Sequence, residues 1–323
     1  MPIVYFRIAG RGIPRALRAP ALERLLARAD GPSSTASWRT AAFRAITADH
    51  TDPPPIAVAQ LRAAGDGARH GWVAVATPVH LVAGMSSVHL PPDGVLEIEA
   101  SEADTLAAEF NRSFGGGGSR LARGLGSGLL CVFDERLAAD TTPPDEASGG
   151  DVWAHQPRGA GSAKLRRLAT EIEMWLFGHA LNAARRARGL PVISALWFWG
   201  GGALDVPLPR VAGWTGGDDA LFSAWDRRTQ YPAGAGGPDR SKSGVVVVAA
   251  WPGSTAWEEA EQRWMRPAVE DLQAGHLTRL EISAAGRSFS LSAHGLRRFW
   301  RRRQPWWQSF DVVPAPEASR LGD

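Results

Sequence analysis

The stretch from Lys164 to Gly202 constrains the fold of this chain most, because a helical pattern leads directly into a strand pattern. Side chains recur at spacings of three and four up to Arg186, which predicts one amphipathic helix. Its inner stripe is apolar for three turns and becomes polar at His179 and Asn182. A glycine and a proline follow at once, and they end the predicted helix.

A nearly unbroken apolar run, Ile193 to Trp199, comes next. It is too short for a globular helix and favours a strand that is buried on both faces. Gly200, Gly201 and Gly202 follow, and we expect them to form a loop where the backbone can approach a ligand closely. Helix, turn, strand and glycine loop together indicate an α/β unit.

The whole chain has the composition of a globular α/β protein. Its 323 residues are 44% hydrophobic and 21% charged, so a sizeable core is available. A second apolar run at 245–250 and several helical patterns predict a mixed, largely parallel sheet flanked by helices, with antiparallel additions. A Pro-, Gly- and Ser-rich stretch, 139–163, predicts a linker or long loop. It would separate an N-terminal α/β portion (1–138) from a C-terminal one (164–312), before a frayed tail (313–323); one continuous domain is the alternative.

Local signals also make specific predictions. Thr77-Pro78 is expected to separate two short strands, and Ser101 is expected to cap a helix with Asp104 in the capping-box position. The glycine-rich stretch 115–128 has no lysine, so it is not a Walker phosphate loop.

The single cysteine, Cys131, excludes an internal disulfide, and its apolar neighbours favour a packed core thiol. No apolar run approaches the roughly 20 residues of a membrane-spanning helix, and arginines interrupt the N-terminal stretch. We therefore expect a soluble, cytoplasmic protein without a membrane partner.

The eight histidines show no His-x-x-x-His spacing and no carboxylate-rich cluster, and no Gly-x-Ser-x-Gly motif occurs. The sequence therefore predicts no metal site, no cofactor and no catalytic residue.

The central motif nevertheless resembles a known family. The residues that carry the resemblance are His179, Asn182, Arg185, Gly189, Pro191 and the run Leu196 to Gly202. They resemble the RpfE-type regulatory family, which is often labelled cofactor-independent phosphoglycerate mutase-like. Weaker matches lie at 78–81, 110–114 and 258–277, so the resemblance covers most of residues 70 to 300.

The resemblance implies an alkaline-phosphatase-like fold. The related mutases use two metal ions and a serine nucleophile, and their first metal-binding aspartate directly follows the N-terminal strand. Here Ala9-Gly10-Arg11-Gly12 occupies that place, and Ala180 stands where those mutases have a proline. The resemblance therefore implies a degenerate relative: a non-catalytic or regulatory binding protein. A phosphoglycerate mutase-like enzyme with an unrecognised site is an alternative.

Two interpretations of the motif stay open. Arg185 and the N–H groups of Gly200, Gly201 and Gly202 could hold a phosphate or carboxylate. Alternatively, His179 and Asn182 are buried and hydrogen-bonded between helix and sheet, and Arg185 alone reaches solvent.

A second candidate surface lies near the C-terminus, where arginines alternate with aromatic residues. Arginines suit phosphates and aromatic rings stack on bases, so this segment predicts nucleic-acid association. A protein partner anchored by the tryptophans, or a terminal helix that buries them, would explain the same pattern. The residues are Arg297, Arg298, Trp300, Arg301, Arg302, Arg303, Trp306 and Trp307.

Overall fold

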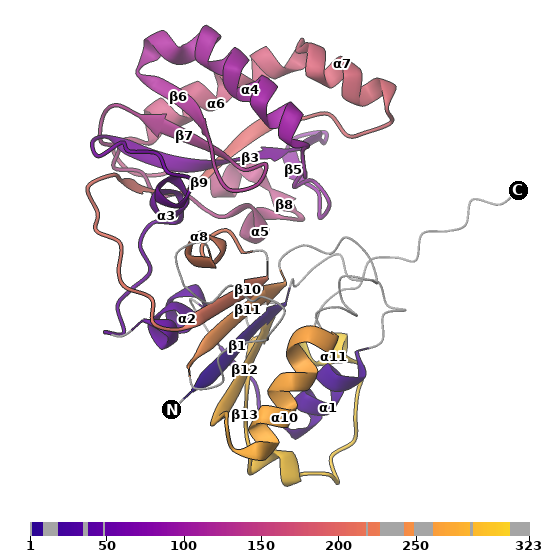
Figure 1. Ribbon diagram of the computed structural model, residues 1–323. Helices are drawn as coiled ribbons and strands as arrows, with labels where there is room; N and C mark the ends of the chain where they lie inside the picture. The colour runs from indigo at the N-terminus through magenta and orange to yellow at the C-terminus, as the bar shows by residue number, and fades with distance from the viewer. Residues whose placement is uncertain are drawn as a thin grey trace, which may run out of the picture. The chain divides into compact units, whose positions relative to one another are not determined.

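The computed structural model describes residues 2–8, 19–34, 38–47, 49–217, 219–226, 242–248, 261–284 and 287–310. The chain divides into two compact units (Figure 1). Unit 1 joins Met1–Pro53 to Pro209–Asp323, and unit 2 is Pro54–Leu208. The stretch 139–163 thus lies inside unit 2 and is not a boundary, because the first strand of the chain pairs with strands from its last third. The tail 313–323 lies outside the described residues.

Unit 1 is built on a mixed sheet whose described strands are in the order β10-β11-β1-β12-β13-β2. The first four of these strands run parallel to one another, β13 runs antiparallel to β12, and β2 runs antiparallel to β13. In register, Phe6 lies between Val246 and Ile282. The strands are β1 (Ile3–Ile8), β2 (Ser33–Ser34), β10 (Trp214–Gly217), β11 (Gly244–Val248), β12 (Arg279–Ala284) and β13 (Arg287–Ser292).

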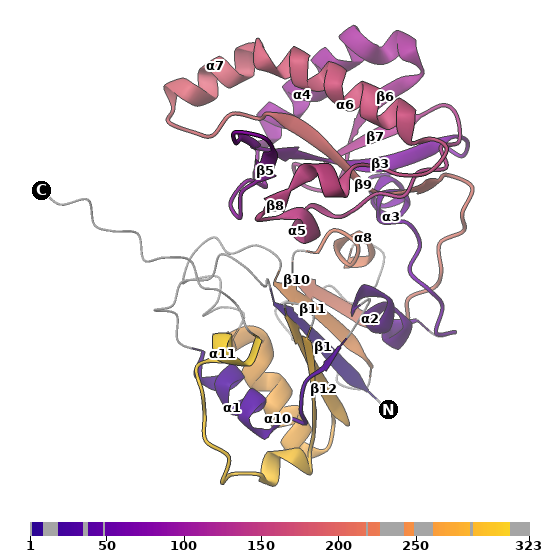
Figure 2. The ribbon, with the colours of Figure 1, turned by 180° about the vertical axis from the view of Figure 1, so that it is seen from behind.

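Helices cover both faces of this sheet (Figures 1 and 2). Val4, Phe6 and Ile8 alternate along β1 and are buried beneath Leu22 of α1 and the fully buried Trp306 of α11. Each such side chain contributes about 1.5–3 kcal/mol by burial. The helical elements are α1 (Pro20–Arg28), α2 (Trp38–Ile46), α8 (Ser223–Asp226), η3 (Glu261–Met265), α10 (Arg266–Ala274), η4 (Gly295–Arg297) and α11 (Trp306–Phe310).

Unit 2 contains an antiparallel sheet with the order β6-β7-β3-β9 and a small sheet with the order β4-β5-β8. The parallel arrangement expected for most of the chain is therefore confined to unit 1. The strands of unit 2 are β3 (Trp72–Val79), β4 (Val82–Ala83), β5 (Val88–Leu90), β6 (Ser119–Arg123), β7 (Leu129–Phe133), β8 (Gly150–Asp151) and β9 (Ala195–Ala203).

The larger sheet of unit 2 packs against α4 and α6 through a core that includes Phe110, Phe133, Ile172 and Phe198. The opposite face contacts α3 (Figure 1). The helical elements of unit 2 are α3 (Ile56–Ala63), α4 (Ala100–Phe114), η1 (Gly115–Gly117), α5 (Pro144–Ala147), η2 (Val152–His155), α6 (Ser162–Phe177) and α7 (Ala180–Ala187). None of the described helices is long and apolar enough to cross a membrane.

Several local predictions were wrong. The helix predicted from Lys164 ends at Phe177, and α7 restarts after Gly178. β3 runs unbroken through Thr77-Pro78, because β9 pairs with it at both residues, opposite Trp197 and Leu196. Glu99, not Ser101, caps α4, and its capping-box partner is Glu102.

Candidate functional site

His179 is the N-cap residue of α7. Its backbone is extended, and its Nδ1 accepts the Leu181 N–H at 3.1 Å. An accepting Nδ1 carries no proton, so the ring proton is on Nε2. Nε2 lies 2.9 Å from Glu109 Oε2 but at an angle that does not make a directed hydrogen bond. The Trp175 ring packs edge-on against the imidazole, with the two ring centroids 4.5 Å apart. Only 6% of His179 is exposed.

Asn182 joins three elements through its amide. Nδ2 donates to the carbonyls of Leu176 at 2.8 Å and Ile193 at 2.9 Å, and Oδ1 accepts the Ile193 N–H at 2.8 Å. The side chain thus ties the end of α6 and the segment before β9 to α7. The prediction that His179 and Asn182 are buried and hydrogen-bonded is confirmed.

Arg185 does not reach solvent, which corrects the expectation for it. Its Nη1 donates to both carboxylate oxygens of Glu102, at 2.9 and 2.7 Å, and its Nε donates to the Pro191 carbonyl at 2.7 Å. The arginine is 3% exposed and the glutamate 7%. The charge can be buried because α4 supplies a counter-charge 83 positions away, which local sequence does not reveal.

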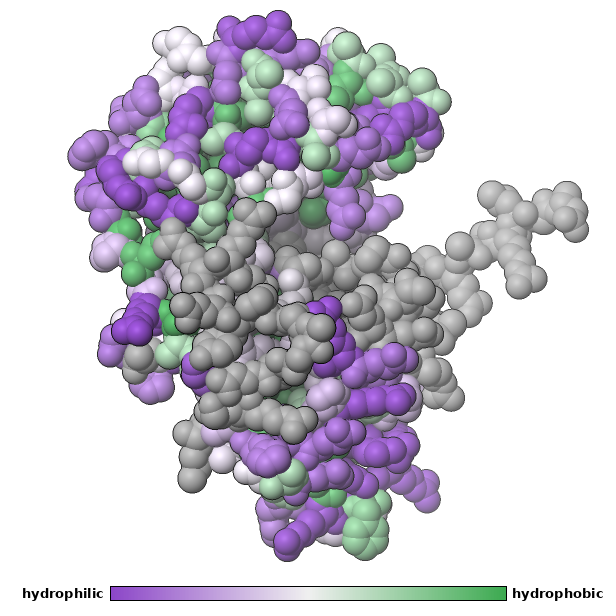
Figure 3. Space-filling model, viewed as in Figure 1, coloured by the Kyte–Doolittle hydropathy of each residue, from purple (hydrophilic) through white to green (hydrophobic). Residues whose placement is uncertain are grey.

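α7 buries polar side chains and exposes several alanines, although Leu181 packs against the core and Arg186 is exposed. Its buried residues are Asn182 and Arg185, whereas Ala180, Ala183 and Ala187 are exposed. Figure 3 shows hydrophobic and hydrophilic colours side by side over α7.

The three glycines lie inside β9 and do not form a loop beyond it. Gly200 (φ +60°) and Gly201 lie opposite the single residue Ala74 of β3, a β-bulge of the kind that favours a left-handed glycine. A Cβ on Gly201 would lie 2.1 Å from the Trp72 ring, and one on Gly202 would lie 2.2 Å from Pro55. These glycines permit close packing against neighbouring side chains. Arg185 shares none of these contacts, so the motif does not assemble the anion site considered above.

The C-terminal arginines divide into two groups. Arg298 donates to the Arg28 carbonyl at 3.1 Å and to Asp30 at 2.6 Å, and Arg301 donates to the Ala29 carbonyl at 2.7 Å. These two arginines hold the segment against the C-terminal end of α1, where cations are favoured by the helix dipole.

The remaining residues of that segment face solvent. Phe299 and Trp300 are 79% and 67% exposed, with their rings 5.5 Å apart at 81°. Arg297, Arg302 and Arg303 are also exposed. We call Arg297, Phe299, Trp300, Arg302 and Arg303 the basic-aromatic surface. Trp306 is 1% exposed and belongs to the core, and the side chain of Trp307 lies outside the described part of the chain.

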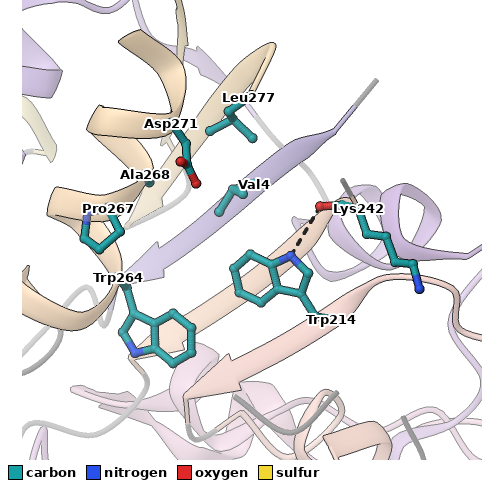
Figure 4. Close-up of a pocket in the computed structure, with 8 residues that line it drawn as sticks. All are labelled: Val4, Trp214, Lys242, Trp264, Pro267, Ala268, Asp271 and Leu277. Atoms are coloured by element: carbon teal, nitrogen blue, oxygen red, sulfur yellow. Dashed lines mark hydrogen bonds between the residues drawn. The ribbon is translucent and has the colours of Figure 1, made fainter. Parts of the chain in front are cut away.

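A small pocket in unit 1 was not predicted from the sequence (Figure 4). Two parallel indoles, Trp214 and Trp264, stack at 5.7 Å along one side of it, and the Lys242 side chain points away from them. Trp214 lies opposite Gly244 in register, and a Cβ there would be 2.0 Å from the indole. The other lining residues are Val4, Pro267, Ala268, Asp271 and Leu277.

Cys131 is fully buried in β7, as predicted, and burial raises the pKa of its thiol well above the usual range. It is therefore not a nucleophile. Within the described ranges, no group of three or more His, Cys, Asp and Glu side chains is placed to hold a metal ion.

Comparisons with known proteins give weak likenesses. No family model and no curated protein matches the sequence. Among solved structures, a protein from Pyrococcus horikoshii is 12% identical over 90% of this chain and 86% of its own, with a TM-score of 0.42. The cofactor-independent phosphoglycerate mutase from Thermoplasma acidophilum is 13% identical over 97% and 95%, with a TM-score of 0.36. Likenesses at this level do not establish a shared fold.

Proposed function

We propose that this chain is a binding protein, regulatory in role or non-catalytic as a phosphoglycerate mutase, that is related to the RpfE-type family and has a degenerate alkaline-phosphatase-like fold without the two-metal centre. The observation that carries the proposal is the internal use of the motif. His179 caps α7, Asn182 joins three elements, and Arg185 is paired with Glu102. The residues of the resemblance thus act as structural links.

The carboxyl end of the parallel strands supports the same proposal. The residues after β1 are Ala9-Gly10-Arg11-Gly12, without a carboxylate. Asp219, two residues beyond β10, is 2% exposed; its Oδ2 accepts from Arg39 at 2.9 Å and its Oδ1 from the Leu221 N–H at 2.9 Å. This carboxylate is neutralised by an arginine and is not presented to a cation.

An activity assay tests the proposal. Purified protein, shown to be folded by a cooperative thermal transition, is incubated with manganese and 3-phosphoglycerate. We expect no 2-phosphoglycerate above the level of a protein-free control. Turnover that a chelator abolishes and added manganese restores would contradict the proposal.

A second candidate function rests on the basic-aromatic surface. Two adjacent exposed rings flanked by exposed guanidinium groups match the stacking and phosphate contacts that single-stranded nucleic acids offer. Because Arg298 and Arg301 hold the segment to α1, the rings are presented from a fixed backbone. A protein partner anchored by Trp300 is the competing interpretation.

A salt titration of oligonucleotide binding distinguishes the nucleic-acid interpretation from the protein-partner interpretation. We expect single-stranded oligonucleotide binding at low salt, weakened and with a flatter salt dependence when Arg301, Arg302 and Arg303 are replaced by serine. A variant with only Arg302→Ser and Arg303→Ser keeps the Arg301 anchor and should show most of that effect. Trp300→Ala should weaken binding without changing the salt slope. Absence of binding by the wild-type protein at low salt would end the nucleic-acid proposal.

A further inference from the structure

The hairpin formed by β4 and β5 places a serine and a histidine in direct contact. Ser87 Oγ lies 2.7 Å from His89 Nε2. The residues are two positions apart in an extended segment, so their side chains emerge on the same face. A hydroxyl donating to Nε2 requires the ring proton to be on Nδ1, which is the tautomer of a general base.

The turn of the hairpin leaves one edge of the imidazole open. The Gly84 N–H donates to the Ser87 carbonyl at 2.7 Å, which fixes the backbone of the serine. A Cβ at Gly84 would lie 3.4 Å from His89 Nε2 and 3.2 Å from the Ser87 carbonyl oxygen. The absence of a side chain there keeps space beside the reacting atoms.

The pair has a different role from the other histidines with described contacts in unit 2. His80 Nδ1 contacts the Val192 carbonyl at 2.9 Å, and His179 caps a helix, so both contact the main chain. His89 is exposed, and its described hydrogen bond is to the Ser87 hydroxyl. The fold does not need this contact to satisfy a buried polar group.

Exposed apolar side chains lie on the same hairpin and on η2, which contacts β5. Val82 lies opposite His89 in register and is 46% exposed. Met85 is fully exposed and Trp153 is 80% exposed. β8 pairs with β5 so that Asp151 lies opposite His89, and Asp151 Oδ1 accepts the Trp153 N–H at 3.0 Å (Figure 2 shows β5 and β8 side by side). Asp151 thereby holds the indole-bearing turn at the edge of the small sheet. This surface suits an apolar acyl chain.

We propose that Ser87 is a nucleophile, activated by His89, that accepts an acyl group from an ester with an apolar acyl chain. The Ser87 oxygen bonds to the ester carbonyl carbon while its proton passes to His89 Nε2. The carbon–oxygen bond to the leaving alcohol then breaks, and His89 returns the proton to that oxygen. The products are acyl-Ser87 and the alcohol, and water releases the acid by the same route in reverse. The distance of 2.7 Å lies within the range that nucleophile–base pairs adopt.

The full-length protein is tested with p-nitrophenyl butyrate. We measure the nitrophenol burst and locate the acyl group by peptide mass spectrometry. The adjacent Ser86 is the matched control, because it is exposed on the same turn and has no described histidine contact. Acylation is expected at Ser87 and not at Ser86. Ser87→Ala should remove the burst, Ser86→Ala should keep it, and His89→Gln should slow it about 100-fold.

The exposed apolar side chains beside the pair can be tested separately, through the preference for one ester over another. Trp153→Ala should reduce the preference for the butyrate over the acetate ester. Equal labelling of Ser86 and Ser87, or an unchanged burst in folded His89→Gln protein, would overturn the proposal. Neither outcome bears on the mutase assay or the oligonucleotide titration.

Discussion

At the scale of single residues, the buried pair of Arg185 and Glu102 has the largest energetic consequence. Both partners are nearly inaccessible, and each satisfies the charge of the other. A buried pair adds little net stability compared with apolar side chains, but removal of one partner leaves an uncompensated charge in the interior.

Glu102→Ala should therefore lower the free energy of unfolding by about 3–5 kcal/mol. Arg167→Ala is the matched control, because Arg167 pairs with Glu171 on the surface, where an ion pair contributes about 0–1 kcal/mol. Urea unfolding of both variants measures the difference. Equal effects would show that the buried charge is not paired as described.

His179 permits a test of capping alone. His179→Ala removes the bond to the Leu181 N–H and should lower the free energy of unfolding by about 1–3 kcal/mol. Asparagine also accepts from backbone N–H groups at N-caps, so His179→Asn should recover part of that loss. If both variants lose the same amount, the contact with Glu109 and Trp175 is what matters.

At the scale of the elements, β9 shows which features local sequence can predict. The apolar runs at 193–199 and 245–250 were sufficient to locate β9 and β11. The end of β9 was misjudged because three glycines normally indicate a loop, whereas here a bulge and two large neighbours, Trp72 and Pro55, require them. The need for glycine is set by residues of β3 and of the segment before α3, which are far from β9 in the chain and cannot be inferred from the local sequence.

Gly201→Ala should be strongly destabilising, since its Cβ would overlap the Trp72 ring. Overpacking of this kind costs about 1–3 kcal/mol. Gly115→Ala is the control, because no atom lies within 4 Å of a Cβ placed there. Thermal melting of the two variants should differ clearly; similar melting temperatures would contradict the described packing of β9.

The sheet of unit 1 contributes a dependence on pH. Burial raises the pKa of Glu281 on β12, against the opposing effects of Ser290 and Arg279. The folded state therefore holds this proton more tightly than the unfolded chain, whose value is 4.5. The resulting stabilisation is present below that value and is lost as the pH rises through the raised pKa. Glu281→Gln should consequently lose less stability than the wild type as the pH rises above 4.5. If the free energies of unfolding of the wild type and of Glu281→Gln change with pH in the same way, this prediction is contradicted.

At the scale of the whole molecule, the two units differ in how the chain builds them. Unit 2 is one continuous segment, Pro54–Leu208, with its own core, whereas unit 1 needs both ends of the chain. A fragment of residues 54–208 should therefore unfold cooperatively in urea, as an independent domain does. A non-cooperative transition would show that unit 2 depends on unit 1. The composition of 139–163 indicated a domain boundary because Pro-, Gly- and Ser-rich stretches are typical of loops. Composition does not indicate which strands pair, and strand pairing sets the boundary between the two units.

The central place of β1 also has a consequence for the growing chain on the ribosome. β1 ends at Ile8 and lies between β11, which begins at Gly244, and β12. At about 5–20 residues per second, β1 waits roughly 10–50 s after its own synthesis for either neighbour to be translated. During that interval both edges of an apolar strand lack their final partners while unit 2 can already close. β1 is thus a segment of the nascent chain that needs a chaperone's protection until both neighbours have been made.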